Sequence, residues 1–196
     1  ARLMGGDLTV RSALGQGSCF SLWLLPASAA VQQPALRSDA ELIAAGRASG
    51  EALFAAGHAI LAAAEPLERD FVARLRADAA IPTTDGLDDE QLADHLAAYL
   101  VALAKTLTGL GDSAVEPTWL QDSGDIQSLV ARRHGRQRQR LGWTHEHVER
   151  EYELLKVLLD DFLARRDAAE PGIAEVVHTL VARAEAASLA ALQSRA

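Results

Sequence analysis

Residues 132–163 read RRHGRQRQRLGWTHEHVEREYELLKVLLDDFL, and this stretch decides the fold of the chain. Gly142 predicts the end of one helix, and Thr144 predicts the N-cap of the next. The apolar positions that follow advance by four, three, four and three residues, which is the spacing of one face of an α-helix. They are Val148, Tyr152, Leu155, Leu159 and Phe162. The stretch therefore predicts two long helices joined by a tight turn.

Helical spacing continues through the rest of the chain after residue 38. Capping-box patterns at Ser38–Glu41 and Asp88–Gln91 predict two helix starts. The expected helices span about residues 39–64, 66–79, 88–110 and 119–140, then run from Thr144 through Phe162 and from residue 170 onward. In the fourth, Ile126, Leu129 and Val130 are expected to face inward, and a break near Gly124 is left open. This predicts six helices that pack as a bundle or as a globin-like stack.

Composition narrows the class of protein. Of the 196 residues, 49% are hydrophobic and 5% aromatic, which is typical of a soluble helical chain. The formal net charge of -8 argues against a nucleic-acid partner. Cys19 is the single cysteine and predicts no internal disulfide, so we expect a cytoplasmic location. The most apolar region, residues 42–64, is interrupted by Arg47, Glu51 and His58, which predicts no membrane span.

The first 26 residues have a different pattern. Apolar and polar residues alternate on either side of Gly15-Gln16-Gly17, which predicts a β-hairpin. The string LMGGDLTVRSALGQGSCFSLWLLP closely resembles the last segment of a histidine-kinase-type ATPase domain. The resemblance implies a remnant of an α/β sandwich, with Ser18 as a support beside the adenine pocket. It also implies ATP and Mg²⁺ for the whole kinase, whose binding boxes would lie upstream of this chain.

The domain boundaries follow from these patterns. The chain has no initiator methionine, so we expect it to begin inside a longer protein. Residues 1–26 are expected to be the end of the ATPase domain and residues 27–38 a flexible linker, because ASAAVQQPALRS is small, polar and without periodicity. Residues 39–196 are then an all-helical domain.

A second resemblance is centred on residues 125–162. They resemble the N-terminal sensory domain of the RsbR/RsbRD co-antagonist proteins, a haem-free globin-like module. The positions that carry the resemblance are His134, Arg138, Gly142, Trp143, Glu151, Tyr152, Leu154 and Leu155. The resemblance implies a sensory or regulatory role. The domain order departs from the common arrangement, since here the helical module follows the ATPase segment.

His134, Arg138 and Glu151 are the polar residues of this stretch that we expect to meet. His134 and Arg138 lie one helical turn apart, and Glu151 lies in the first turns of the next helix. The expected cluster is a structural latch between two helices, and its alternative role is to transmit a conformational change or contact a partner. The five arginines from 132 to 140 are either a solvated helix face or a partner surface. No catalytic constellation and no metal-ligand spacing is evident.

These observations lead to one expected function and two alternatives. The chain is expected to be the sensory or regulatory part of a two-component sensor histidine kinase, homodimeric and without a cofactor of its own. Alternatively, it is a non-catalytic scaffold that docks a switch kinase or a response regulator. The weaker alternative is a haem or small-ligand sensor, with His58 and His95 as residues that could face a pocket.

Overall fold

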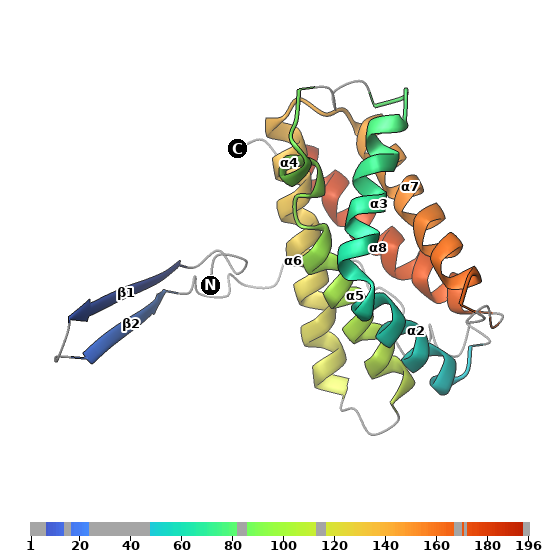
Figure 1. The fold of residues 1–196 in the computed structure, drawn as a ribbon, viewed down its shortest axis with the longest axis horizontal. Helices are drawn as coiled ribbons and strands as arrows, with labels where there is room; N and C mark the ends of the chain where they lie inside the picture. Colours follow the sequence, from blue (N-terminus) through green and yellow to red (C-terminus); the bar gives the residue numbers. More distant parts are fainter. Residues whose placement is uncertain are drawn as a thin grey trace. The chain divides into compact units, whose positions relative to one another are not determined.

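The computed structural model describes residues 7–13, 17–23, 48–81, 86–112, 117–166, 170 and 172–193, with side chains described from residue 48 onward except at 117–125. The chain divides into two compact units, Ala1–Leu36 and Arg37–Ala196. Figure 1 draws the strands of the first and the helices of the second. Each unit is described by itself.

The first unit contains two paired strands. β1 (Asp7–Ala13) and β2 (Gly17–Trp23) run antiparallel, with Asp7 opposite Trp23 and Ala13 opposite Gly17. Ser18 lies in β2 opposite Ser12. Gly15 and the expected linker at 27–38 fall outside the described residues. The link between this strand pair and an ATPase sandwich stays a prediction.

The second unit is helical, in agreement with the mainly α fold that the sequence predicts. Its helices are α2 (Gly50–Ala62), α3 (Ala64–Ala77), α4 (Asp89–Ala93), α5 (Leu96–Gly111), α6 (Pro117–Arg140), α7 (His145–Ala164) and α8 (Ile173–Gln193). In Figure 1, α6 and α7 lie on opposite sides of the unit, and α8 packs between them. α2 packs closely against α5.

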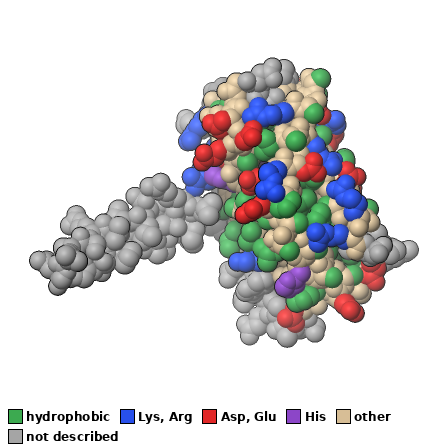
Figure 2. Space-filling view, in the orientation of Figure 1, with side chains coloured by type: hydrophobic (Ala, Val, Ile, Leu, Met, Phe, Trp, Pro, Cys, Tyr) green, Lys and Arg blue, Asp and Glu red, His purple; other side chains and the backbone are tan. Residues whose placement is uncertain are grey.

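The core consists mainly of leucine side chains from facing helices. Leu53 and Ile60 of α2 and Leu100, Leu103 and Leu107 of α5 are all 0% exposed. Burying each such side chain contributes about 1.5–3 kcal/mol to folding. The spacing of these residues gives each helix one apolar face, and those faces meet in a single cluster. Among the described residues, none of the helices combines the length and the apolar character that spanning a bilayer requires. Figure 2 shows acidic and basic side chains interspersed over one face of the helical unit.

Two expected helix boundaries are wrong. The first helix does not run unbroken from residue 38, because Ser49 has extended backbone angles and its side chain caps α2. The third helix does not run unbroken from Asp88 to Leu110, although Asp88 and Gln91 do form the predicted capping box. It ends at Ala93, and a new helix, α5, begins at Leu96.

The buried face of α6 is also shifted from the prediction. Ile126 is 53% exposed, whereas Gln127 is 5% exposed and donates a hydrogen bond to Thr106 of α5 at 2.6 Å. The buried threonine hydroxyl supplies a polar partner that no local apolar pattern reveals. Val130 is buried as expected. The helix continues past Gly124 without a break.

Candidate functional site

The turn between α6 and α7 fixes how these helices approach each other. Gly142 has a φ of 77°, in the left-handed region that favours glycine. The Trp143 amide donates to the Arg138 carbonyl at 2.9 Å, which closes the last turn of α6 as a Schellman motif does. Thr144 then caps α7 by accepting from the His147 amide. The predicted stop and start signals therefore form the corner beside the site.

Arg138 and Glu151 form a buried ion pair across this corner. The Arg138 side chain is 0% exposed, and its Nη2 donates to Glu151 Oε1 at 2.6 Å. Its Nε donates to Glu151 Oε2 at 3.1 Å, so the pair has two parallel hydrogen bonds. The Trp143 ring covers the guanidinium at 4.3 Å. Two hydrogen bonds and an aromatic face thus hold one charged group in the interior.

Arg138 also binds the end of α4. Its guanidinium donates to the carbonyl oxygens of Gln91 at 2.9 Å and Leu92 at 2.7 Å. Carbonyls in the last turn of a helix have no partner within the helix, and a cation there interacts favourably with the helix dipole. Arg138 therefore joins α4 to α6 and, through Glu151, to α7.

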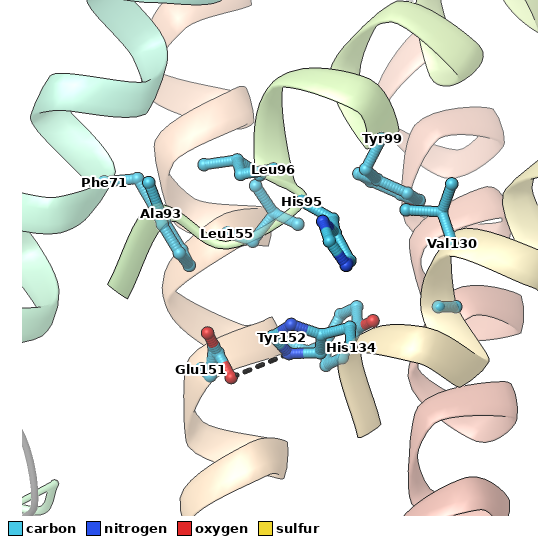
Figure 3. Close-up of a pocket in the computed structure, with 11 residues that line it drawn as sticks. Phe71, Ala93, His95, Leu96, Tyr99, Val130, His134, Glu151, Tyr152 and Leu155 are labelled. Carbon is cyan, nitrogen blue, oxygen red and sulfur yellow. Dashed lines mark hydrogen bonds and ion pairs between the residues drawn. The ribbon is translucent and has the colours of Figure 1, made fainter. Parts of the chain in front are cut away.

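His134 lies between two carboxylates. Its Nδ1 is 2.9 Å from Asp94 Oδ2, and its Nε2 is 3.0 Å from Glu151 Oε2, the contact drawn in Figure 3. Because both ring nitrogens face carboxylate oxygens, the ring fits best as an imidazolium that donates from both. Burial alone would lower the pKa of His134, but Glu151 and Asp94 outweigh it and raise the pKa above its ordinary value.

The four charged groups form one neutral cluster, which we call the ionic network: Asp94, His134, Arg138 and Glu151. Burial alone would raise the pKa of Glu151, but His134 and Arg138 outweigh it and lower the pKa to about 2. With His134 protonated, two positive groups face two negative groups. The network therefore has no net charge, which is the condition under which buried charges are tolerated.

Asp94 is the strained member of the network. It lies in the break between α4 and α5 with a φ of 47° and a ψ of -109°, angles that residues with a Cβ rarely adopt. Its side chain is 2% exposed and is held by His134. Such a backbone conformation costs about 1–3 kcal/mol and persists only when the surroundings enforce it. His134 binds the Asp94 carboxylate, and Arg138 binds the carbonyl oxygens of Gln91 and Leu92 at the end of α4. These contacts hold the backbone of Asp94 in place.

A second polar chain extends the site to α8. The Ser188 hydroxyl donates to the Ala131 carbonyl at 2.7 Å, so the Tyr152 hydroxyl, 2.8 Å away, donates to Ser188. The Tyr152 ring meets the His134 ring edge-on at 5.9 Å. Burial raises the pKa of Tyr152, so this hydroxyl keeps its proton. The ring thus links the ionic network to the packing of α8.

A small cavity adjoins the network, as Figure 3 shows. Its volume is about 30 Å³, which has room for about two water-sized groups. Tyr99, 5% exposed, lines it, and the Tyr99 hydroxyl has no hydrogen-bond partner among the described residues. The Trp143 Nε1 is the other buried side-chain atom without a partner among the described residues, and Trp143 is not one of the residues that line this cavity. Unpaired buried polar atoms are uncommon in folded proteins.

The residues singled out from the sequence divide between the two units. The structure brings together His134, Arg138, Trp143, Glu151 and Tyr152, with Gly142 in the adjoining turn. Ser18 and Gly17 belong to the strand unit, and Gly15 lies outside the described residues. Of the five arginines, Arg138 points inward, whereas Arg136 and Arg140 are exposed.

Sequence reasoning missed Asp94 and Tyr99. Asp94 and His95 are two polar residues between Leu92 and Leu96, and aspartate is a weak helix former, so a break could have been suspected there. The partner of Asp94 could not have been predicted, because His134 lies 40 residues away in the chain.

Within the described residues, no group of three or more His, Cys, Asp or Glu side chains is arranged to hold a metal ion. Comparisons with known protein families, with curated proteins and with solved structures find no match to this chain.

Proposed function

We propose that the helical unit is a sensory or regulatory domain of a two-component sensor histidine kinase. In this proposal the ATPase domain ends in the β1–β2 pair, and Ser18 supports its adenine pocket. ATP and Mg²⁺ bind to the kinase upstream of this chain. The helical unit takes a globin-like arrangement, works in the cytoplasm and forms a homodimer. Its task is to pass a change in helix packing to the kinase.

The observation that carries the proposal is the ionic network at a strained helix junction. A buried ion pair is weak evidence for stability, because well-packed apolar residues of the same volume often stabilise a domain as well or better. This network instead makes the positions of α4, α6 and α7 depend on the charges of four side chains. An element held by a few strong contacts against backbone strain can switch between two arrangements. That is a property suited to a regulatory domain.

The two family resemblances support a role in kinase signalling. The residues that resemble the RsbR/RsbRD sensory module are concentrated in this one site and do not scatter over the surface. The strand pair that resembles the end of a kinase ATPase domain precedes the helical unit in the chain. The two resemblances together support a sensory module in the same chain as a kinase.

The test is autophosphorylation of the whole protein that contains this chain. Radiolabelled ATP and Mg²⁺ are added to the wild type, to Asp94→Asn and to Glu146→Gln, an exposed α7 residue outside the network. The proposal predicts that Asp94→Asn changes the rate of phosphate incorporation several-fold while Glu146→Gln does not. A protein that incorporates no phosphate, or a rate unchanged by Asp94→Asn, would contradict it.

One observation favours the scaffold as a second candidate. Arg132, Arg136 and Arg140 follow each other at four-residue steps along α6, and none of them has a carboxylate partner among the described residues. Other arginines, such as Arg76 and Arg150, pair with aspartates. An unpaired basic stripe on an acidic chain suits an acidic partner surface.

Charge reversal tests the scaffold. Binding of candidate response regulators is measured for Arg136→Glu/Arg140→Glu and for Arg69→Glu, an exposed arginine on α3. The scaffold predicts a loss of binding in the first variant and not in the second. Equal binding by the two variants would show that the arginine stripe of α6 is not the binding surface. The haem alternative has no support from the cavity, because about 30 Å³ does not admit a haem.

A further inference from the structure

We propose that the junction between α4 and α5 is a switch controlled by one proton. When His134 gives up its proton, Asp94 leaves the interior and the junction takes a second conformation, so the signal is a rise in pH. The switch rests on the proposed sensory role, because it names the signal that such a domain receives. Its test needs no kinase activity, so its failure can be told apart from failure of the kinase proposal.

The His134 ring needs two N–H groups to satisfy its two acidic neighbours. It faces Asp94 through Nδ1 at 2.9 Å and Glu151 through Nε2 at 3.0 Å, and the side chains of these acids are 2% and 4% exposed. A neutral imidazole has one N–H, and its other nitrogen carries a lone pair. Loss of the proton therefore turns one hydrogen bond into a repulsive contact and leaves the ionic network with one negative charge in excess. A buried charge without compensation is strongly unfavourable.

Asp94 is the member of the network that can move. Glu151 lies within the regular helix α7 and keeps two hydrogen bonds from Arg138, whose guanidinium does not lose its charge. Asp94 is held by imidazoles instead, by His134 and by His95, whose Nε2 is 3.4 Å from Asp94 Oδ1. Its backbone has a φ of 47°, so a move of the side chain to solvent also allows this strained conformation to relax. One short segment thus has two arrangements that different charges favour, as a switch requires.

His95 does not titrate in the same range as His134. Burial lowers the pKa of His95, although Asp94 opposes this, so its imidazole is neutral near pH 7. Burial also acts on His134, but there Glu151 and Asp94 outweigh it and raise the pKa. The charge of His134 is therefore present below about pH 6.5 and is lost as pH rises through the raised pKa. A rise in pH opens the junction.

The other titratable groups on the surrounding helices keep their charge over this range. Arg133, one residue before His134 in α6, stays cationic. Burial raises the pKa of Tyr99 in α5 and of Tyr152 in α7, so both hydroxyls keep their protons. Glu185 of α8 already forms an ion pair with a lysine of α7 at 2.7 Å. The proton that the network loses is therefore that of His134.

Protons can reach the His134 ring from solvent. Of its side chain, 13% is exposed. Ala93 and His95, which flank Asp94 in the chain, are also partly exposed, so the junction lies near the surface of the helical unit. Figure 3 shows His95 and His134 in the wall of the same small cavity. Asp94 can therefore turn outward while α5 and α6 stay folded.

The test is a titration of the full chain from about pH 5 to about pH 9, the range that brackets an ordinary and a raised histidine pKa. The ring of His134 and the backbone amides are followed by NMR in the same samples. NOEs between the His134 ring and Asp94 report whether the two side chains stay together. The variants are His134→Gln, which has no titrating proton, and His95→Gln, the matched control that removes the other imidazole beside Asp94. Dispersion of the spectra shows that each variant is folded.

The amides of Asp94, His95 and Leu96 should shift in one step, with the midpoint of the His134 ring and above about pH 6.5. The NOEs between His134 and Asp94 should be lost over that step, which distinguishes movement from the direct effect of the ring charge on nearby shifts. The amides of α2 should stay unchanged. His95→Gln should keep the step at residues 94 and 96, and His134→Gln should lack it.

Three results would overturn the proposal. The first is a His134 ring that keeps its proton to about pH 9. The second is a ring that titrates while its NOEs to Asp94 persist, because the junction then stays closed without the proton. The third is a step at the junction that disappears in His95→Gln or remains in His134→Gln. The wild-type titration alone decides the first two, so the proposal can fail even where a variant does not fold.

Discussion

His134 and Glu151 belong to different helices, and their side chains meet with 3.0 Å between Nε2 and Oε2. The same carboxylate also pairs with Arg138. Glu151 is therefore the shared acceptor of both cations in the network, and its side chain is 4% exposed. Removing its charge should have a larger effect than removing that of any exposed carboxylate in the domain.

Glu151→Gln leaves Arg138 and His134 buried with one negative partner between them. Breaking a buried ion pair in this way costs about 3–5 kcal/mol. Urea unfolding, followed by circular dichroism, measures this loss directly. The exposed control Glu146→Gln should stay within about 0.5 kcal/mol of the wild type. A Glu151→Gln protein as stable as that control would show that the charge of Glu151 is not needed.

Asp94→Asn keeps the shape of the side chain and removes one of the two negative charges beside His134. The pKa of His134 should fall, because a negative neighbour favours the imidazolium. An NMR titration of the His134 ring in both proteins measures the change. A pKa of His134 that stays the same or rises would mean that the contact with Asp94 has no influence on its protonation.

The stability of the domain should depend on pH in both directions. The pKa of His134 is raised in the folded state. Its contribution to the free energy of unfolding is therefore fully present below about pH 6.5 and is lost as pH rises through the raised pKa. The pKa of Glu151 is lowered from 4.5 to about 2, so its contribution is complete above about pH 4.5 and is lost as pH falls towards 2. Both contributions are complete between about pH 4.5 and 6.5.

Urea midpoints measured from about pH 2 to well above pH 6.5 check the dependence of stability on pH. In Glu151→Gln the loss on the acid side should shrink, since the titrating carboxyl is gone. The loss on the alkaline side should be smaller and should end at a lower pH, because His134 has one carboxylate fewer and its folded-state pKa is raised less. A wild-type curve with the same shape as that of Glu151→Gln would contradict the assignment of these groups.

Two glycines of α6 and its turn should respond to alanine for different reasons. A Cβ at Gly142 meets no atom within 4 Å, so Gly142→Ala costs only the left-handed backbone, about 1–2 kcal/mol. A Cβ at Gly135 in α6 would collide with the backbone of Ser188 in α8. Gly135→Ala should therefore cost more, because one of the helices must move. Thermal unfolding of both variants compares the two costs, and the reverse order would be inconsistent with this packing.

Much of the helical fold follows from local signals. The α7 stripe from Val148 to Phe162 is buried as its spacing predicts, and Thr144 caps the helix. Gly142 ends the preceding helix as the sequence predicts, and it does so with a positive φ. These signals act within one or two helical turns, so a single sequence is enough to recognise them.

The parts that sequence reasoning got wrong depend on contacts between distant residues. The break at Asp94 costs backbone strain that the sequence around it does not offset, and its compensation comes from His134 and Arg138 on another helix. Gln127 is buried in place of Ile126 because the hydroxyl of Thr106 accepts a hydrogen bond from its side chain. In both cases a polar partner brought by the tertiary fold overrides the apolar pattern.

If the ionic network holds the α4–α5 junction in its strained form, losing one of its charges should loosen that junction. Amide hydrogen exchange of the full chain, with the wild type and His134→Gln compared, measures this. The amides of α4 and of Asp94 and His95 should exchange at least about tenfold faster in the variant, a loss of about 1.4 kcal/mol. Those of α2 and α8 should keep their protection. Unchanged exchange in α4, or a uniform increase in all helices, would contradict it.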